Sequence, residues 1–246
     1  MKAFELDFFK KYDKEEILLR DGIYSQFDCR VLYSYVREFK PKRILEFAPR
    51  TGRTTSCIME ALKKNNEEDG LEVEYFAFEK DEEFFKSTRE FIKSFSFVNL
   101  KYDSNIIGSR LLNKIEGLDF LLIDANHDFL LAEWYVENLF PSVKSQGHIH
   151  IHDIDYNKNK NGWEDISFGK SYHSHPDVIH SEVIKKLYPS LSFKVPSVIK
   201  TFEGDIIKKF YEENKDNLEF YSTPEASRKL NCYNEFDRSM YFKLKI

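Results

Sequence analysis

The sequence predicts an α/β fold: a doubly wound, mostly parallel, seven-stranded Rossmann-like sheet with an antiparallel C-terminal strand. Three observations support this prediction. Short apolar runs alternate with longer amphipathic stretches along most of the chain, several runs end at an acid or a histidine, and no internal repeat or low-complexity linker interrupts the alternation. The length suits one domain with insertions, so we expect residues 1–246 to form a single domain.

Two helices are expected before the first strand. Apolar residues recur at roughly helical spacing from Phe4 to Leu19, and Asp28 to Phe39 repeats them on one face and ends before Pro41. We therefore expect residues 1–40 to form a helical cover, packed on the edge of the sheet or over a ligand.

Strands and helices then alternate. Apolar runs predict strands at Arg43–Phe47, Val73–Phe78, Phe97–Tyr102, Leu118–Ile123 and Ile149–Ile151. Amphipathic stretches predict helices at Thr54–Lys64, Glu82–Phe95, Ile106–Glu116 and Phe129–Val143. This order is typical of strand, helix, strand units in a parallel sheet, where ligands bind beyond the carboxyl ends of the strands.

The pattern changes after the fifth predicted strand. Residues 156–180 and 205–238 lack a clear period and are expected to be lids or inserts, with 205–238 as a helix plus a loop. Val178–Tyr188 predicts a helix, Leu191–Val195 a sixth strand and Ser239–Ile246 the final strand.

Charge and composition exclude several classes of protein. A net charge of −5 and a pI near 5.9 argue against broad binding to nucleic acid or to an anionic membrane. No apolar run is long enough to span a bilayer, and the N-terminus lacks the apolar core of a signal peptide. Cys29, Cys57 and Cys232 show no spacing that indicates a disulfide framework or a zinc site, so we expect a cytoplasmic protein.

The loop after the first strand has the form of a ligand-binding turn. The run Glu46-Phe-Ala-Pro-Arg-Thr-Gly52 leads into a helix whose N-terminal amides would face a ligand, and an acid there accepts hydrogen bonds from an ammonium or hydroxyl group. The glycine fingerprint of dinucleotide-binding enzymes is absent, and so is a P-loop. Both absences argue against a dehydrogenase or an NTPase.

Several motifs between Phe27 and Ile154 stand in an order found in one enzyme family. They are Asp28 and Arg37 ahead of Lys40-Pro41-Lys42, the acids Glu46, Glu79 and Asp103, then Ile123-Asp-x-x-His127 and His150-Ile-His-Asp-Ile154. In this order and spacing the chain resembles class I S-adenosylmethionine-dependent methyltransferases, in particular the small-molecule O-methyltransferase branch that includes sugar and macrolide-glycoside enzymes.

The resemblance implies a role for each acid at a strand end. Carboxylates bind paired hydroxyl groups well and favour a sulfonium cation, which agrees with these roles. Glu46, Ala48 and Gly52 would line the methionine part of S-adenosylmethionine, Glu79 would hold its ribose hydroxyls, Asp103 would lie near adenine, and Asp124 would lie beside the sulfonium.

The loop departs from the family pattern at Ala48 and Arg50, where glycine is usual, and it keeps Gly52. The bulky Arg50 predicts either a reshaped loop or weaker cofactor binding. A catalytically inactive, methyltransferase-like scaffold protein is therefore one alternative.

A second group of polar residues, Asp124, His127, His152 and Asp153, follows the fourth and fifth predicted strands. Methyl transfer to a hydroxyl is an in-line displacement, which needs the acceptor oxygen deprotonated and aimed at the methyl group. Two arrangements satisfy this: Asp153, His127 or His152 acts as the base, or Asp124, His152 and Asp153 hold a divalent cation, as the matching positions do in metal-dependent relatives.

The nature of these ligands bears on the cation. Oxygen ligands suit Mg²⁺, whereas a histidine shifts the preference toward Mn²⁺, Fe²⁺ or Zn²⁺. A metal-dependent hydroxylase or lyase on the same scaffold is a second alternative.

The remaining histidines divide into two groups. His148 and His150 share a strand face with His152, and we expect these two to be core residues under a helix. His173, His175 and His180 are candidates for contact with the acceptor. The leading hypothesis is transfer of a methyl group to a hydroxyl of a small polar acceptor, a sugar or nucleotide-linked sugar. The oligomeric state stays open, with a homodimer as one option.

Overall fold

The computed structural model describes residues 7–22, 24–104, 106, 108–125, 127, 129–157, 162–165, 203–223, 226–227 and 239–245. The predicted helix Val178–Tyr188 and the predicted strand Leu191–Val195 lie outside these residues, as do His173, His175 and His180. No helix of the described part is long and apolar enough to cross a membrane.

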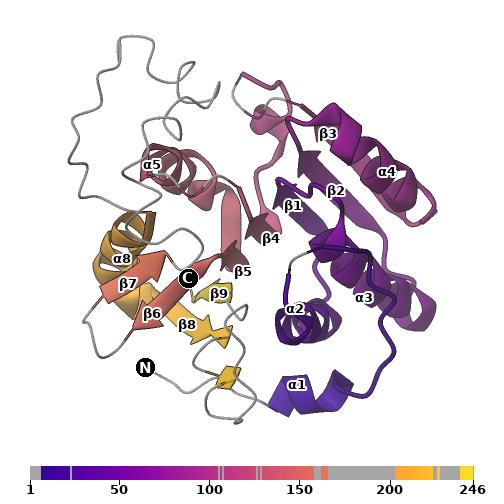
Figure 1. Cartoon of the computed structure of the whole chain (residues 1–246), viewed down its shortest axis with the longest axis horizontal. Helices are drawn as coiled ribbons and strands as arrows, with labels where there is room; N and C mark the ends of the chain where they lie inside the picture. The colour runs from indigo at the N-terminus through magenta and orange to yellow at the C-terminus, as the bar shows by residue number, and fades with distance from the viewer. Residues whose placement is uncertain are drawn as a thin grey trace.

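The centre of the molecule is a sheet in the order β3-β2-β1-β4-β5-β9-β8 (Figure 1). Neighbours among β1 to β5 pair in parallel, and β9 runs antiparallel to both β5 and β8. This confirms the predicted seven-stranded, mostly parallel sheet with an antiparallel C-terminal strand. Its strands are β1 Arg43–Phe47, β2 Val73–Phe78, β3 Val98–Asp103, β4 Leu118–Ile123, β5 Val143–His152, β8 Leu218–Ser222 and β9 Ser239–Leu244.

A hairpin of β6 Ile154–Asn157 and β7 Gly162–Asp165 follows β5. Helices cover both faces of the sheet. The α-helices are α1 Asp7–Tyr12, α2 Gln26–Phe39, α3 Arg53–Asp69, α4 Glu82–Lys93, α5 Phe129–Asn138 and α8 Glu203–Asn214, with 3₁₀ turns η1 Leu112–Lys114, η2 Phe140–Ser142 and η5 Lys215–Asn217.

Local sequence explains where the central helices begin and end. Ser25 caps α2 by accepting a hydrogen bond from the Asp28 amide, and Asp81 caps α4 in the same way. Gly70 ends α3 with a left-handed φ of 67°, so α3 continues beyond the predicted end at Lys64.

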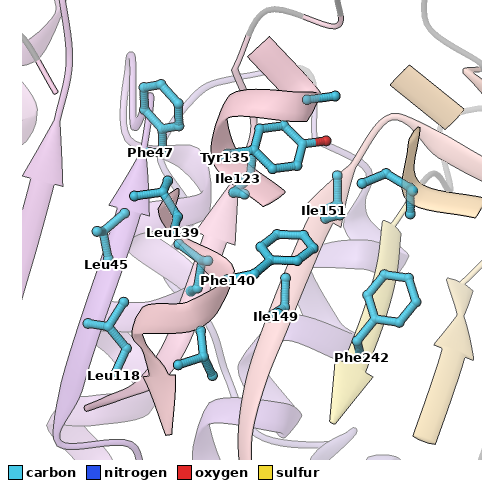
Figure 2. Close-up of a cluster of buried hydrophobic side chains, with 14 of the residues drawn as sticks. Leu45, Phe47, Leu118, Ile123, Tyr135, Leu139, Phe140, Ile149, Ile151 and Phe242 are labelled. Carbon is cyan, nitrogen blue, oxygen red and sulfur yellow. The ribbon is translucent and has the colours of Figure 1, made fainter. Parts of the chain in front are cut away.

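Alternate side chains of the strands build two hydrophobic cores. Ile44, Phe120 and Tyr241 face α2, α3 and α4 in one core. Leu45, Ile123 and Ile151 face α5 and α8 in the other, which Figure 2 shows. Side chains of even number on β5, including His148 and His150, therefore point toward α2, where both are buried as expected.

Beyond the shifted ends of α3, α5 and β5, three regions differ from the predictions. The predicted helix Ile106–Glu116 is wrong: it is a turn followed by η1. Gly108 has a left-handed φ of 80°, and the Ser109 hydroxyl accepts a hydrogen bond from the Leu111 amide, so local side-chain bonding competes with a helix. The first helix is also shorter than Phe4–Leu19, because after α1 the chain runs without regular structure past Glu15, whose carboxylate pairs with Arg37 of α2.

The third difference lies in residues 205–238. A helix and a loop were expected there, but α8 begins at Glu203 and is followed by β8, which is an edge strand of the main sheet. The short strand β8 alternates buried and half-buried residues, which is usual for an edge strand.

Candidate active site at the carboxyl ends of the central strands

The candidate site lies where β1, β4 and β5 end side by side. Phe47 pairs with Ile123, and Ile123 pairs with Ile151. Asp124 and His152 follow these paired residues directly, so the sheet register itself brings the two side chains together. A parallel α/β sheet places its ligand site at this edge.

The loop after β1 keeps the backbone of a glycine-rich turn. Ala48 has a φ of 68°, Arg50 of 48° and Gly52 of 88°, all in the left-handed region that favours glycine. The Ala48 amide donates to the Phe78 carbonyl of β2 at 2.8 Å, which fixes the start of the turn. Ala48 and Arg50 therefore differ from the family pattern in their side chains, while the loop backbone keeps the left-handed conformation that glycine favours.

Arg50 does not block the loop, because its side chain lies to one side. Its guanidinium lies over the ring of Phe84, 5.7 Å from the centroid, and the residue is exposed. Its amide donates to Glu79 Oε2 at 2.9 Å, while Glu79 Oε1 accepts from the Asp81 amide at 3.0 Å. Glu79 thus ties the loop to the end of β2, next to the place where the ribose is expected.

Glu46 lies beneath the loop and is completely buried. Its carboxylate accepts hydrogen bonds from the hydroxyls of Thr54 at 2.6 Å, Thr55 at 2.7 Å and Tyr75 at 2.5 Å. Burial raises the pKa of Glu46, against the effect of these three donors. Its carboxylate therefore joins β1 and β2 to the first turn of α3 and supports the loop from below.

Asp103 ends β3, and its carboxylate is half-buried. It accepts a hydrogen bond from the Ser109 hydroxyl at 2.7 Å, and its carbonyl oxygen accepts from the Glu79 amide. Asp103 and Ser109 line a surface depression together with Tyr102 and Arg110. The structure thus places the residue expected near adenine beside the residue expected at the ribose.

Asp124, His152 and Asp153 form a compact cluster. His152 Nδ1 lies 3.2 Å from Asp124 Oδ1 and 3.4 Å from Asp153 Oδ2, and one ligand atom from each residue lies within 4.8 Å of the others. Burial lowers the pKa of His152, but the carboxylates of Asp124 and Asp153 outweigh it and raise the pKa to about 10. Asp153 has a left-handed φ of 62°, an unusual backbone for a residue other than glycine.

His127 lies between two carboxylates. Its Nδ1 is 2.8 Å from Glu203 Oε2 and its Nε2 is 3.3 Å from Asp153 Oδ2. Burial lowers the pKa of His127, but Glu203 and Asp153 together raise it well above the usual value. Once protonated, a histidine in this position donates one ring N–H to each acid. It is an intermediate link between them.

Glu203 was not singled out in the sequence. It is 76 residues away from His127 along the chain and precedes a stretch without clear periodicity, so no local pattern points to it. Tyr24 was missed for the same reason. Its ring packs on His152 with centroids 4.3 Å apart, and its hydroxyl lies 3.0 Å from His150 Nε2.

The segment before α2 lies against the glycine-type loop. Arg20 Nε donates to the Thr51 carbonyl at 3.0 Å, and Arg53 donates to the carbonyls of Tyr24 at 2.7 Å and Arg20 at 2.9 Å. The part of the N-terminal region that reaches the site is thus an irregular segment, and α1 packs farther away on α2.

A family model matches the part of the chain that carries the candidate site. Residues 46–154 match the model of a methyltransferase domain, a range that begins at Glu46 and ends after the Asp153 turn. No curated protein matches the sequence.

Solved methyltransferase structures share the fold. The O-methyltransferase TomG from Streptomyces achromogenes has a TM-score of 0.51 at 11% identity, and the match covers 99% of this chain and 90% of that chain. The O-methyltransferase from Bacillus cereus has a TM-score of 0.51 at 13% identity, with 97% and 88% covered. Podospora anserina PaMTH1 has a TM-score of 0.51 at 14% identity, with 100% and 99% covered.

At these identities the structures establish the fold alone. Residues 46–154 match the model of a methyltransferase domain, and the chain has the fold of class I S-adenosylmethionine-dependent methyltransferases.

Proposed function

We propose that this protein transfers the methyl group of S-adenosylmethionine to a hydroxyl oxygen of a small polar acceptor, a sugar or nucleotide-linked sugar. The observation that carries the proposal is the position of the acid and histidine cluster. It lies at the ends of β4 and β5, directly beside a loop after β1 that keeps the left-handed turns of a glycine-rich cofactor loop. The similar structures of TomG and of the Bacillus cereus enzyme hold S-adenosylmethionine and S-adenosylhomocysteine, respectively.

The residues present fit the cofactor. The loop backbone has the left-handed φ of a glycine-type turn at Ala48 and Gly52, Glu79 directly follows β2, and Asp103 is the last residue of β3. Asp124 is the most exposed acid of the cluster, with a side chain that is 28% exposed. Its carboxylate can therefore face the positively charged sulfur of a cofactor that binds from solvent. When bound, S-adenosylmethionine supplies an electrophilic methyl group on a positively charged sulfur.

The cluster also fits a divalent cation. Asp124, His152 and Asp153 present two carboxylates and one imidazole whose ligand atoms lie within 4.8 Å of one another. This mixed donor set suits Mn²⁺ or Fe²⁺ better than Mg²⁺. A cation held here would polarise the acceptor hydroxyl and make it easier to deprotonate.

The chain's own residues orient the acceptor. Burial raises the pKa of Asp153, but His152 and His127 outweigh this and hold it below its usual range, so the carboxylate stays ionised at neutral pH. An ionised Asp153 accepts the hydrogen bond of the acceptor hydroxyl, aims its oxygen at the methyl group and takes up the proton that the oxygen loses when it is methylated. His127 is already bonded to two acids, so Asp153 serves this role better than His127.

Isothermal titration calorimetry with S-adenosylmethionine and S-adenosylhomocysteine tests the cofactor part of this proposal. We expect binding of both, measured with and without Mn²⁺. Absence of binding of either compound under both conditions would refute the proposal.

A methyl-labelled cofactor incubated with a panel of sugars and nucleotide-linked sugars then tests the acceptor class. Label should enter at least one member of the panel, and Asp153→Asn should lower the rate of incorporation. Label transfer only to non-carbohydrate hydroxyls would refute the sugar assignment and leave the reaction class in place.

A further inference from the structure

Glu203 is the buried acid that joins the C-terminal part of the chain to the site. It is the first residue of α8 and is 1% exposed. Its two carboxylate oxygens accept hydrogen bonds from different elements: Oε1 from the Tyr135 hydroxyl of α5 at 2.7 Å, and Oε2 from His127 Nδ1 at 2.8 Å. A buried carboxylate is rare unless it is paired, and here each oxygen has its own donor.

Tyr135 fixes the position of Glu203. Its ring belongs to the hydrophobic core between the sheet and α5, together with Ile123 and Ile151 (Figure 2). A large aromatic side chain in a close-packed core has little freedom to move, so its hydroxyl is a stationary donor. Glu203 is therefore anchored on the side away from the candidate site.

His127 passes this restraint on to Asp153. With Nδ1 bonded to Glu203, its Nε2 faces Asp153 Oδ2 at 3.3 Å, and rotation of the ring would break both contacts. The Asp153 backbone is strained, because a left-handed φ is unfavourable for a residue other than glycine, so the surrounding contacts must hold it in place. Its carboxylate is held between His127 and His152.

We propose that Glu203 is a positioning residue of the methyl-transfer site: through His127, it holds the Asp153 carboxylate where the acceptor hydroxyl is oriented. The role of Glu203 in methyl transfer rests on the proposed function, whereas the contacts that join Glu203 to Asp153 through His127 do not. Partners that orient a functional side chain from behind contribute about 10–100-fold to activity in comparable sites.

Nuclear magnetic resonance on the full chain with ¹⁵N-labelled histidine tests the link without any ligand. The variants are Glu203→Gln, Tyr135→Phe and, as a matched control, Glu212→Gln, which changes a glutamate on the same helix with a side chain that is 62% exposed. Resonances of His127 and His152 are assigned with His127→Asn and His152→Asn.

In Glu203→Gln we expect the His127 ring N–H resonance to lose its downfield, hydrogen-bonded position. The ring resonances of His152, which lies beyond Asp153 in the chain of contacts, should shift as well, because Asp153 is no longer held. Tyr135→Phe should shift both in the same direction by less, and Glu212→Gln should shift neither. His152 resonances that stay at their wild-type positions in Glu203→Gln would overturn the inference.

Titration with S-adenosylhomocysteine separates positioning from general structural damage. Glu203→Gln should keep the dissociation constant within about twofold, because Glu203 acts on the acceptor side of the site. A loss of about tenfold or more would indicate a wider structural role and would also overturn the inference. If the wild-type protein binds no cofactor, the proposed function fails, and the histidine spectra still decide the role of Glu203.

Discussion

Gly52 offers a quantitative test of the loop that would receive the cofactor. It has a φ of 88°, and a Cβ atom added there would lie 2.7 Å from Thr88 Oγ1 and 2.9 Å from Thr88 Cγ2. Gly70 provides a matched control, because its φ of 67° is also left-handed but an added Cβ would meet nothing within 4 Å. Alanine at the two positions therefore shares the backbone strain and differs in the steric contact.

The expected magnitudes follow from these two terms. A left-handed backbone costs an alanine about 1–2 kcal/mol, and the loss of glycine's freedom in the unfolded chain returns about 0.4–1 kcal/mol. Gly70→Ala should therefore destabilise the protein by about 1 kcal/mol. Gly52→Ala adds overpacking against Thr88, which typically costs about 1–3 kcal/mol, so its total should be about 2–4 kcal/mol.

Urea denaturation followed by circular dichroism measures both free energies of unfolding. Thr88→Ala removes the two nearest atoms that an added Cβ would meet and leaves Arg20 Nε, near the end of a flexible side chain, at 3.1 Å. In that background Gly52→Ala should therefore cost close to what Gly70→Ala costs, about 1 kcal/mol. Thr88→Ala alone loses the hydrogen bond from its hydroxyl to the Arg50 carbonyl, which the double-mutant cycle subtracts. Equal costs for the two glycine variants, or strict additivity with Thr88→Ala, would refute the reasoning.

Three further predictions concern the loop, the core and the cluster. Ala48→Gly should raise stability by about 1 kcal/mol, because the backbone strain it relieves exceeds the conformational entropy it adds to the unfolded chain; a clear loss of stability in the same urea assay would contradict this. Burial, with Lys243 adding to it, lowers the pKa of His148 to about 3, so the folded state binds fewer protons than the unfolded state between that pH and the usual value. The free energy of unfolding should be highest above pH 6.5 and fall toward acid by up to about 1.4 kcal/mol per pH unit. His148→Leu should reduce this slope, which is measured by denaturation at a series of pH values. Asp124→Asn removes the charge that faces the sulfonium, so it should weaken binding of S-adenosylmethionine about five- to tenfold. Binding of S-adenosylhomocysteine, whose sulfur is neutral, should weaken by about twofold or less. Equal losses for the two compounds in calorimetry would argue against this position of Asp124.

Much of the fold could be predicted because its signals are local. The runs Arg43–Phe47, Val73–Phe78 and Leu118–Ile123 are short, mostly apolar segments, and all three are strands with the predicted bounds. Burial on both faces of a parallel sheet requires such runs, so the pattern and the structure have one cause. The helix predicted at Ile106–Glu116 failed because Ser109 and Gly108 favour a turn over a helix of otherwise suitable composition.

The candidate site was predictable only in part. Asp124 directly follows β4, His152 is the last residue of β5 and Asp153 comes next, so the sheet register brings the three together. Their role in function stays a prediction. The Ala48 and Arg50 substitutions suggested a reshaped loop, yet the backbone keeps left-handed turns at both. The sequence alone does not reveal whether the contacts around a substituted residue hold its backbone at the φ that glycine would have.

By itself, the sequence determined the order of the first five strands, the acids at their ends and the likeness to a methyltransferase, because these depend on residue spacing within short segments. Only the tertiary structure decided that Glu203 and Tyr135 complete the site from behind, that His127 is held between two acids, and that Tyr24 covers His152. These contacts join residues far apart in the chain, and hydrogen bonds between distant side chains leave no period or motif in either segment.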